Sequence, residues 1–291
     1  MPELPEVEIV RSGLNRLIIG LEVENIWSDW PKNFPNSEGD VNNFLINSKI
    51  NAVGRRGKSL IIDLNTNYSL ITHLKMTGQL VFEGKEHFGA GHPSSSLLGP
   101  LPDKSTRVVI SFKDGAKLFF NDQRKFGWMK LVPTSEVKNN EFIKGLGPEV
   151  LSDDFGSQNF IRHMRSRPNS QIKAVLLDQK VIAGVGNIYS DESLWMAKIH
   201  PASIVKDISE KKLDNLFNSL VEVMRESIKK GGSTDRNFVD FEGKKGSYLN
   251  FAKVFRREGQ ACPRCGREIK KIRVAGRGTH ICEYCQRISV K

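Results

Sequence analysis

The four cysteines of this 291-residue chain constrain its fold more than any other feature, because they form two Cys-x-x-Cys pairs. Cys262 and Cys265 make the first pair, Cys282 and Cys285 make the second, and sixteen residues separate them. This spacing is typical of a tetrahedral zinc site with four thiolate ligands. A disulfide within each pair is the alternative, but it would cross-link almost nothing, and the chain shows no secretion signal. Four thiolates leave no open position for substrate, so we expect one structural Zn²⁺ that holds a rigid hairpin.

The basic residues are concentrated in the same part of the chain. The formal net charge is +11 and the sequence pI is about 9.5. Residues 244–291 contain 13 Lys and Arg against 3 Asp and Glu, a net of +10, which leaves +1 for the first 243 residues. Such a concentration predicts a polyanionic partner. The charged fraction of 26% and the lack of a long apolar run indicate a soluble protein without a membrane segment, and we expect it in the cytoplasm.

The first of three expected domains, residues 1–133, is predicted to be mostly β-structure after one N-terminal helix. Short apolar stretches bounded by turn residues indicate strands, and Asp114-Gly115 is a hairpin signal. The expected strands are 21–27, 50–53, 59–64, 68–74, 79–82, 107–112, 117–121 and 127–132. Residues 83–104 are rich in Gly, Pro and Ser and predict a mobile surface loop. The pattern favours a β-sandwich.

Helical periodicity dominates the second expected domain, residues 134–243, and the third, residues 244–291, is the cysteine-containing segment. The expected helices are 157–165, 172–177, 190–197 and 213–229, the last ending at Gly231-Gly232. The predicted fold class is therefore α+β. It combines a β-sandwich with flanking helices, a helical domain and a zinc-bearing β-hairpin.

The N-terminal stretch places a proline and two carboxylates at the start of the first helix. Met before Pro2 suits an aminopeptidase, and removal of Met1 would leave Pro2 with a secondary amine. The partial positive charge of a helix N-terminus favours the neutral form of an amine, which is a nucleophile toward carbonyl carbon. Glu3 and Glu6 are three residues apart and can lie on one side of the first turn. Taken alone, a plain helix start with dipole-complementing acids is the simpler interpretation.

Two further groups of residues suggest contacts with a nucleic acid. The Gly-rich turn before Asn187 lets a backbone approach closely and opens a helix, and helix N-termini bind phosphate. Met76, Arg124 and Phe126 each follow a strand and lie near a Gly, which suggests turn tips. Such side chains can wedge between DNA bases. From spacing alone, a core position is favoured for Met76.

These features together resemble the bacterial formamidopyrimidine-DNA glycosylase family along the whole chain. Pro2-Glu3-Leu4-Pro5-Glu6-Val7 is similar to the family's N-terminal signature. Residues 186–194 resemble its helix–two-turn–helix, and Arg277-Gly278-Thr279-His280 with the cysteines resembles its zinc finger. The resemblance implies an enzyme that removes oxidised purines from damaged double-stranded DNA, acting as a monomer in the bacterial cytoplasm.

The resemblance also implies roles for single residues. After loss of Met1, the Pro2 amine attacks C1′ of the damaged nucleotide, and Glu3 donates or shuttles protons. Lys58 binds phosphate and assists β-elimination, and Arg277 assists δ-elimination. Asn187 would hold a phosphate, and Met76, Arg124 and Phe126 would fill the void left by the flipped base. His73 and Glu6 complete the DNA-binding set, with Glu6 as a structural and electrostatic partner of the N-terminal site. The wedge role then replaces the core prediction for Met76, because a flipped base leaves a gap in the stack.

The chain departs from the family pattern at three places. Ser105 stands where a His is frequent, Pro168 stands where a Lys is common, with Arg165 or Arg167 as substitutes, and Phe255-Arg256 replaces a Tyr-Gly pair. Residues 232–246 resemble the loop that covers the flipped base. Two alternatives stay open: an endonuclease VIII-like glycosylase for oxidised pyrimidines, and a non-catalytic zinc-ribbon DNA-binding protein.

Overall fold

The structure, a computed structural model, describes residues 2–92, 94–233 and 248–289. It divides into two compact units, residues 1–144 with 230–247 and residues 145–229 with 248–291. Met1 and most of the predicted base-covering segment 232–246 lie outside the described residues. The domain boundaries at residues 133 and 243 stay predictions.

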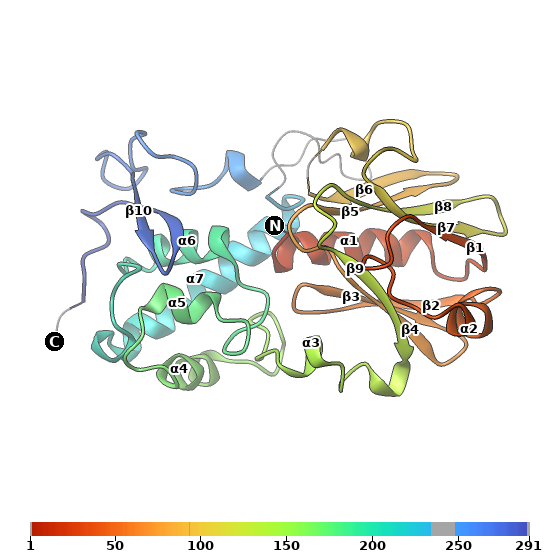
Figure 1. The fold of residues 1–291 in the computed structure, drawn as a ribbon. Coiled ribbons are helices and arrows are strands. Elements are labelled where there is room, and N and C mark those ends of the chain that lie inside the picture. Colours follow the sequence, from red (N-terminus) through yellow and green to blue (C-terminus); the bar gives the residue numbers. More distant parts are fainter. Residues whose placement is uncertain (1, 93, 234–247, 290–291) are drawn as a thin grey trace. The chain divides into compact units, whose positions relative to one another are not determined.

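The first unit is a sandwich of two antiparallel sheets with helix α1 (Leu4–Leu17) running along it (Figure 1). One sheet has the order β1 (Val23–Ser28), β7 (Thr106–Phe112), β8 (Lys117–Asp122), β5 (Gly78–Glu83), β6 (His87–Gly91). The other has the order β2 (Ile50–Arg56), β3 (Ser59–Leu64), β4 (Tyr68–His73), β9 (Trp128–Pro133). Short helical turns are α2 (Glu38–Asp40), Val41–Leu45, Ser95–Leu97, Thr134–Glu136 and α3 (Glu141–Lys144). The predicted strands are present.

One large apolar cluster joins α1 to both sheets of this sandwich. Val7, Val10 and Leu14 of α1 belong to the same buried cluster as residues of both sheets, such as Leu60 and Phe120. These α1 residues recur every three or four positions, so the helix buries one face. Because that face is fixed in the core, the helix N-terminus and Pro2 are held in a defined place.

The predicted loop at residues 83–104 is wrong in its first half. Residues 87–91 form strand β6, which pairs with β5 at the sheet edge. Gly residues disfavour strands, which concealed this one in the sequence. Gly91 is required here by close packing, because a Cβ there would lie 2.6 Å from the Gly78 carbonyl oxygen. Phe88 of β6 in turn packs against Gly13 of α1.

The second unit is mostly helical. It contains α4 (Ser157–Arg165), α5 (Ile172–Leu177), α6 (Asn187–Met196), α7 (Glu210–Lys229), the 3₁₀ turns Val205–Asp207 and Tyr248–Asn250, and the hairpin β10 (Lys270–Val274) and β11 (Arg277–Ile281). The predicted helices at 157–165 and 172–177 are confirmed, whereas α6 begins three residues before its predicted start. The predicted α+β class, with sandwich, helical and hairpin parts, is confirmed. No helix in the described ranges combines the length and apolarity needed to cross a membrane.

Candidate active site and nucleic-acid interface

The N-terminal residues are fixed by hydrogen bonds to the Glu6 carboxylate. Pro2 is buried, and Glu3, directly before α1, is only 3% exposed. One oxygen of Glu6 accepts from the Glu3 backbone N–H at 2.8 Å, and the other accepts from the Ser233 N–H at 2.8 Å. Glu6 therefore ties the segment around Pro2 to the residues that follow α7. This geometry suits the structural and electrostatic role predicted for Glu6.

Lys58 lies in the two-residue turn between β2 and β3, and this turn is tied to α1. Arg55 Nε donates to Glu8 of α1 at 2.9 Å, and its Nη1 donates to the Gly57 carbonyl at 2.9 Å. Gly57 has φ of 58°, a left-handed conformation that glycine adopts without steric cost. The Lys58 side chain is 7% exposed. The Glu8–Arg55 pair, which the sequence did not indicate, thus fixes the Lys58 turn relative to the helix that follows Pro2.

His73, at the end of β4, is a buried neutral imidazole. Burial lowers its pKa to about 3, with the positive charges of Lys75 and Lys58 acting in the same direction. Its Nδ1 accepts from the Lys75 backbone N–H at 2.9 Å, and its ring packs edge-on against Phe142. His73 pairs with Ser59 in the sheet, directly after Lys58. Its predicted contact with DNA stays a prediction, and in the structure it supports the Lys58 end of the sheet.

Met76, Arg124 and Phe126 lie on turns, as their sequence positions suggested. Met76 is 37% exposed and Phe126 is 54% exposed, which is unusual for apolar side chains of this size. The exposed Arg124 guanidinium lies 4.8 Å from the centre of the Phe126 ring. The core interpretation of Met76 is excluded by this exposure. Both turns present side chains to solvent in the way an intercalating wedge requires.

The four cysteines form a cluster that fits a zinc ion. Their Sγ atoms all lie within 4.8 Å of one another, with Cys262–Cys285 at 4.0 Å and Cys265–Cys282 at 3.5 Å. Sulfurs at the corners of a tetrahedron with Zn–S bonds of about 2.3 Å are about 3.8 Å apart. All four are free thiols, so the disulfide alternative is not supported.

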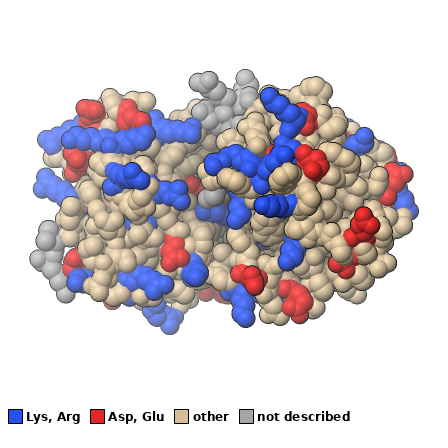
Figure 2. All heavy atoms as spheres, in the orientation of Figure 1, with Lys and Arg blue, Asp and Glu red and all other residues tan. Residues whose placement is uncertain are grey.

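The hairpin between the cysteine pairs presents Arg277 beside its tip. Ala275 and Gly276 have φ of 50° and 72°, so they form a tight turn, and Val274 pairs with Arg277. Arg277 is exposed. Figure 2 shows Lys and Arg side chains gathered over the C-terminal segment of this unit, with a few carboxylates among them. The arrangement can hold a polyanion.

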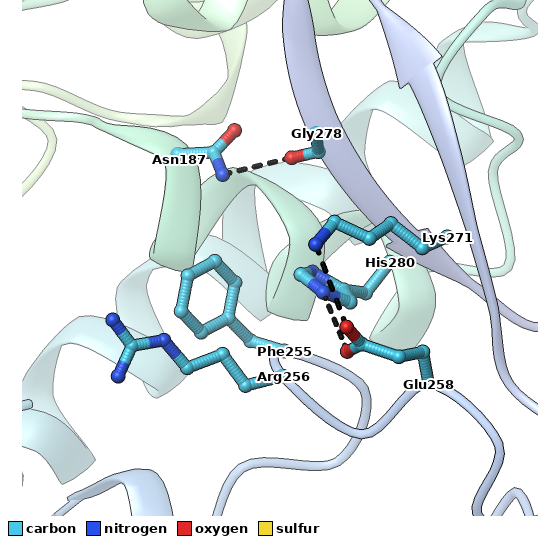
Figure 3. A pocket seen from close by; sticks show the side chains of 7 residues that line it. All are labelled: Asn187, Phe255, Arg256, Glu258, Lys271, Gly278 and His280. Atoms are coloured by element: carbon cyan, nitrogen blue, oxygen red, sulfur yellow. Dashed lines mark hydrogen bonds and ion pairs between the residues drawn. The ribbon is translucent and has the colours of Figure 1, made fainter.

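Asn187 lies at the N-terminus of α6, beside this hairpin. Gly186 precedes the helix, and Asn187 Nδ2 donates to the Gly278 carbonyl at 3.0 Å. The two face a surface cleft of about 510 Å³, shown in Figure 3. The cleft is lined by Asn187, Phe255, Arg256, Glu258, Lys271, Gly278 and His280. An exposed helix N-terminus within a basic cleft suits phosphate.

A buried network joins the hairpin to the helices. Lys173 of α5 and Asp191 of α6 form an ion pair in which both side chains are 0% exposed. Lys173 also donates to Thr279 Oγ1 at 2.7 Å, and Asp191 accepts from the His280 N–H at 2.9 Å. Through these bonds the hairpin is held against the start of α6, where Asn187 lies. Nothing in the sequence pattern pointed to this pair.

Replacing Lys173 by Met is expected to lower the free energy of unfolding by about 3–5 kcal/mol, because it leaves the Asp191 carboxylate buried without its partner. Urea unfolding followed by circular dichroism measures the change. Lys180→Met, at an exposed position of the same unit, is the control and should alter stability little. Equal urea midpoints for Lys173→Met and Lys180→Met would contradict a stabilising role of the ion pair.

The three departures from the family pattern have distinct surroundings. Ser105 is buried and donates to Asp103 at 2.7 Å. Arg165 donates to the Val205 and Ile208 carbonyls, so its guanidinium is committed to the backbone, whereas Arg167 is exposed. Arg167 is therefore better placed than Arg165 to replace the lysine that the family commonly has at the position of Pro168. Phe255 packs edge-on against His280 in the cleft of Figure 3, with Arg256 next to it.

A buried carboxylate that the sequence did not indicate positions these last residues. Glu192 of α6 accepts from the backbone N–H groups of Lys253, Val254 and Phe255 at 2.8–2.9 Å. Burial raises the pKa of Glu192, and the three N–H groups oppose that rise.

The candidate site residues form two groups, one in each unit. Pro2, Glu3, Glu6, Lys58, His73, Met76, Arg124 and Phe126 belong to the first, and Asn187, Arg277 and the four cysteines belong to the second.

Comparison with known proteins matches three family models in chain order. They are the formamidopyrimidine-DNA glycosylase N-terminal domain at residues 1–129, the corresponding H2TH domain at 146–239, and a zinc finger found in FPG and IleRS at 259–288. A formamidopyrimidine-DNA glycosylase of Pelotomaculum thermopropionicum is 38% identical over 289 residues, covering 99% of this chain and 100% of that protein.

Two solved structures of the Lactococcus lactis enzyme superimpose over 98% of this chain and 100% of theirs, each at 36% identity. One is a mutant bound to DNA containing Fapy-dG, with a TM-score of 0.86. The other is the wild-type enzyme bound to DNA containing an oxidised pyrimidine, with a TM-score of 0.84. The match in sequence and in structure extends over the whole chain, and the order of the three domains is the same. The chain therefore belongs to the formamidopyrimidine-DNA glycosylase family, the DNA glycosylases of base excision repair.

Proposed function

We propose that this protein excises oxidised purines from damaged double-stranded DNA and cleaves the strand through a Schiff base on Pro2. The observation that carries the proposal is the buried Pro2 held ahead of α1 beside two buried carboxylates, Glu3 and Glu6. Met1 must be removed for the amine to act. A secondary amine at a helix N-terminus is disposed toward its neutral, nucleophilic form.

In the first step, the Pro2 nitrogen attacks C1′ of the damaged nucleotide and loses its own proton, and the bond from C1′ to the base breaks. The bond from C1′ to the ring oxygen O4′ then breaks and opens the sugar. Glu3 donates or shuttles the protons that the departing base and O4′ take up. Glu3 lies directly after Pro2 in the chain and directly before α1, so its carboxyl belongs to the same short segment as the attacking amine. The product is an iminium between C1′ and Pro2.

In the second step, the iminium makes the C2′ proton acidic. Loss of that proton expels the 3′ phosphate, and loss of the C4′ proton then expels the 5′ phosphate. Lys58 offsets the charge of the first phosphate, and Arg277, exposed beside the hairpin tip, assists the second elimination. Water finally hydrolyses the iminium, which releases the sugar remnant as an aldehyde and restores the Pro2 amine.

Binding of the duplex rests on phosphate contacts in the second unit. Asn187 and the α6 N-terminus hold one phosphate, and one Zn²⁺ bound by the four cysteines keeps the basic hairpin folded. Affinity carried by phosphates falls steeply with salt and does not depend on base sequence. This independence suits an enzyme that must inspect any sequence. We propose that it acts as a monomer in the cytoplasm.

The preference for purines rests on Met76, Arg124 and Phe126, which match the void-filling residues of the purine-specific branch. The Lactococcus lactis enzyme has been solved with both lesion classes, so the preference needs its own test. Duplexes carrying 8-oxoguanine or thymine glycol, assayed at equal concentration in single-turnover mode, provide it. Faster excision of 8-oxoguanine supports the proposal, and faster excision of thymine glycol favours the endonuclease VIII-like alternative.

A further inference from the structure

Asp122, at the end of β8, is a buried carboxylate that the proposed chemistry does not use. The residue is only 1% exposed to solvent. Oδ1 accepts from the Thr77 hydroxyl and from the Arg124 N–H at 3.1 Å. Oδ2 accepts from the Phe126 N–H at 2.8 Å and the Gly127 N–H at 2.7 Å. The Asp122 carboxylate therefore accepts four hydrogen bonds.

These donors come from the two turns that carry the exposed side chains. The first turn, residues 74–77, holds Met76, and the second, residues 122–127, holds Arg124 and Phe126. Gly78 of β5 pairs with Asp122 of β8, so the strand register places the two turns side by side. The Thr77 oxygen also accepts from the Arg124 N–H at 3.2 Å, which closes the link between the turns.

The turns need such support because their backbones are unfavourable. Lys75 has φ of 49° and Lys125 has φ of 57°, a left-handed region that costs a non-glycine residue about 1 kcal/mol. Met76 and Phe126 are among the exposed large apolar side chains, so the core does not enclose them. Their direction is set by the backbone of each turn, and hydrogen bonds to the Asp122 carboxylate hold that backbone.

Arg107 holds the backbone of Asp122 in place. Its Nε donates to the Asp122 carbonyl at 2.9 Å, its Nη2 donates to the Lys104 carbonyl at 2.6 Å, and its Nη1 pairs with Asp29. The Arg107 residue is 5% exposed. The carboxylate thus stands on a rigid strand end, as a group that orients others must.

We propose that Asp122 is the positioning residue for the wedge, holding Met76 in one turn and Arg124 and Phe126 in the other in a single arrangement. This proposal rests on the proposed void-filling function of those side chains. The carboxylate itself touches no substrate. It acts by making two turns that are far apart in sequence enter the base stack as one unit, so that the base opposite the lesion and the gap are engaged together.

The test replaces Asp122 by Asn, which keeps the shape but offers one acceptor oxygen in place of two and turns an NH₂ group toward N–H donors. Single-turnover excision of 8-oxoguanine opposite C is expected to fall by about tenfold or more, since misplaced positioning groups have effects of this order. Cleavage at a preformed abasic site should fall by less than about threefold, because no base must leave the stack. A 2-aminopurine beside the lesion should report weaker unstacking.

Two further variants make the outcome decisive. Asp114→Asn removes a carboxylate from the turn at the opposite end of β8, where it accepts from the Ala116 N–H at 3.0 Å, and it should leave excision unchanged. Thr77→Val removes one donor and keeps the carboxylate, and it should reproduce the Asp122→Asn effect at smaller size. If Asp122→Asn lowers the melting temperature too far to assay, Thr77→Val decides.

Wild-type excision and 2-aminopurine signals in a folded Asp122→Asn protein would overturn the proposal, as would equal losses in Asp114→Asn. If the wild-type protein excises no 8-oxoguanine, the proposed function fails instead. The positioning role is then judged by the 2-aminopurine signal on a duplex with an abasic-site analogue, which needs no catalysis.

Discussion

Replacing Glu3 by Gln is expected to reduce base excision by about a thousandfold, because positioned general acids contribute about 10²–10⁴-fold and glutamine cannot donate a comparable proton. Glu3 directly precedes α1 and is buried, and glutamine has nearly the same shape. The fold should therefore survive. Cleavage of a preformed abasic site should fall far less, because the base is already gone and the Pro2 amine remains.

Single-turnover excision of 8-oxoguanine, with cleavage of an abasic duplex measured alongside, tests this expectation. Glu24→Gln, at an exposed position of β1 in the same unit, is the matched control for loss of one negative charge. A Glu3→Gln protein that excises the base at the wild-type rate would show that the proton comes from another group.

Replacing Cys262 by Ser is expected to remove the zinc ion and to weaken DNA binding by about a hundredfold, because metal binding supplies folding free energy to such small sites. Cys262 is buried in a small cluster with Trp195, Val254 and Ile269, which cannot hold the hairpin by apolar burial alone. Loss of the hairpin removes Arg277 and its basic neighbours from the phosphates. The slope of affinity against salt should become shallower.

Zinc content and fluorescence anisotropy with a labelled duplex, measured across a salt series, give the result. Tyr284→Phe serves as the control. Tyr284 lies between the last two cysteines, and phenylalanine keeps the aromatic ring that stacks on Arg267. Unchanged zinc content and affinity in Cys262→Ser would refute the structural zinc site.

Local pattern was enough to predict most of the fold. The strand at residues 59–64 and the helices at 157–165 and 172–177 have the bounds expected from their apolar periodicity. β6 was missed because its glycines serve close packing, Gly89 against Leu97 and Gly91 against Gly78, which no local propensity encodes. Tertiary contact overrode propensity there.

The candidate site was predictable in its residues and not in its supports. Pro2, Glu3 and the cysteines stand out by position and spacing. The Asp122 carboxylate and the Lys173–Asp191 pair do not. Thr77 lies 45 residues before Asp122, and Lys173 lies 18 residues before Asp191. Buried polar contacts depend on strand register and helix packing, so only the folded chain shows them.

Borohydride trapping tests most directly whether a covalent intermediate forms on the Pro2 amine. Protein shown by mass spectrometry to lack Met1 is mixed with an 8-oxoguanine duplex and sodium borohydride, beside a form whose N-terminus is blocked by an uncleavable extension. We expect a stable protein–DNA adduct, mapped to Pro2, in the first sample and none in the second. No adduct from the processed protein, or an equal yield from the blocked one, would contradict it.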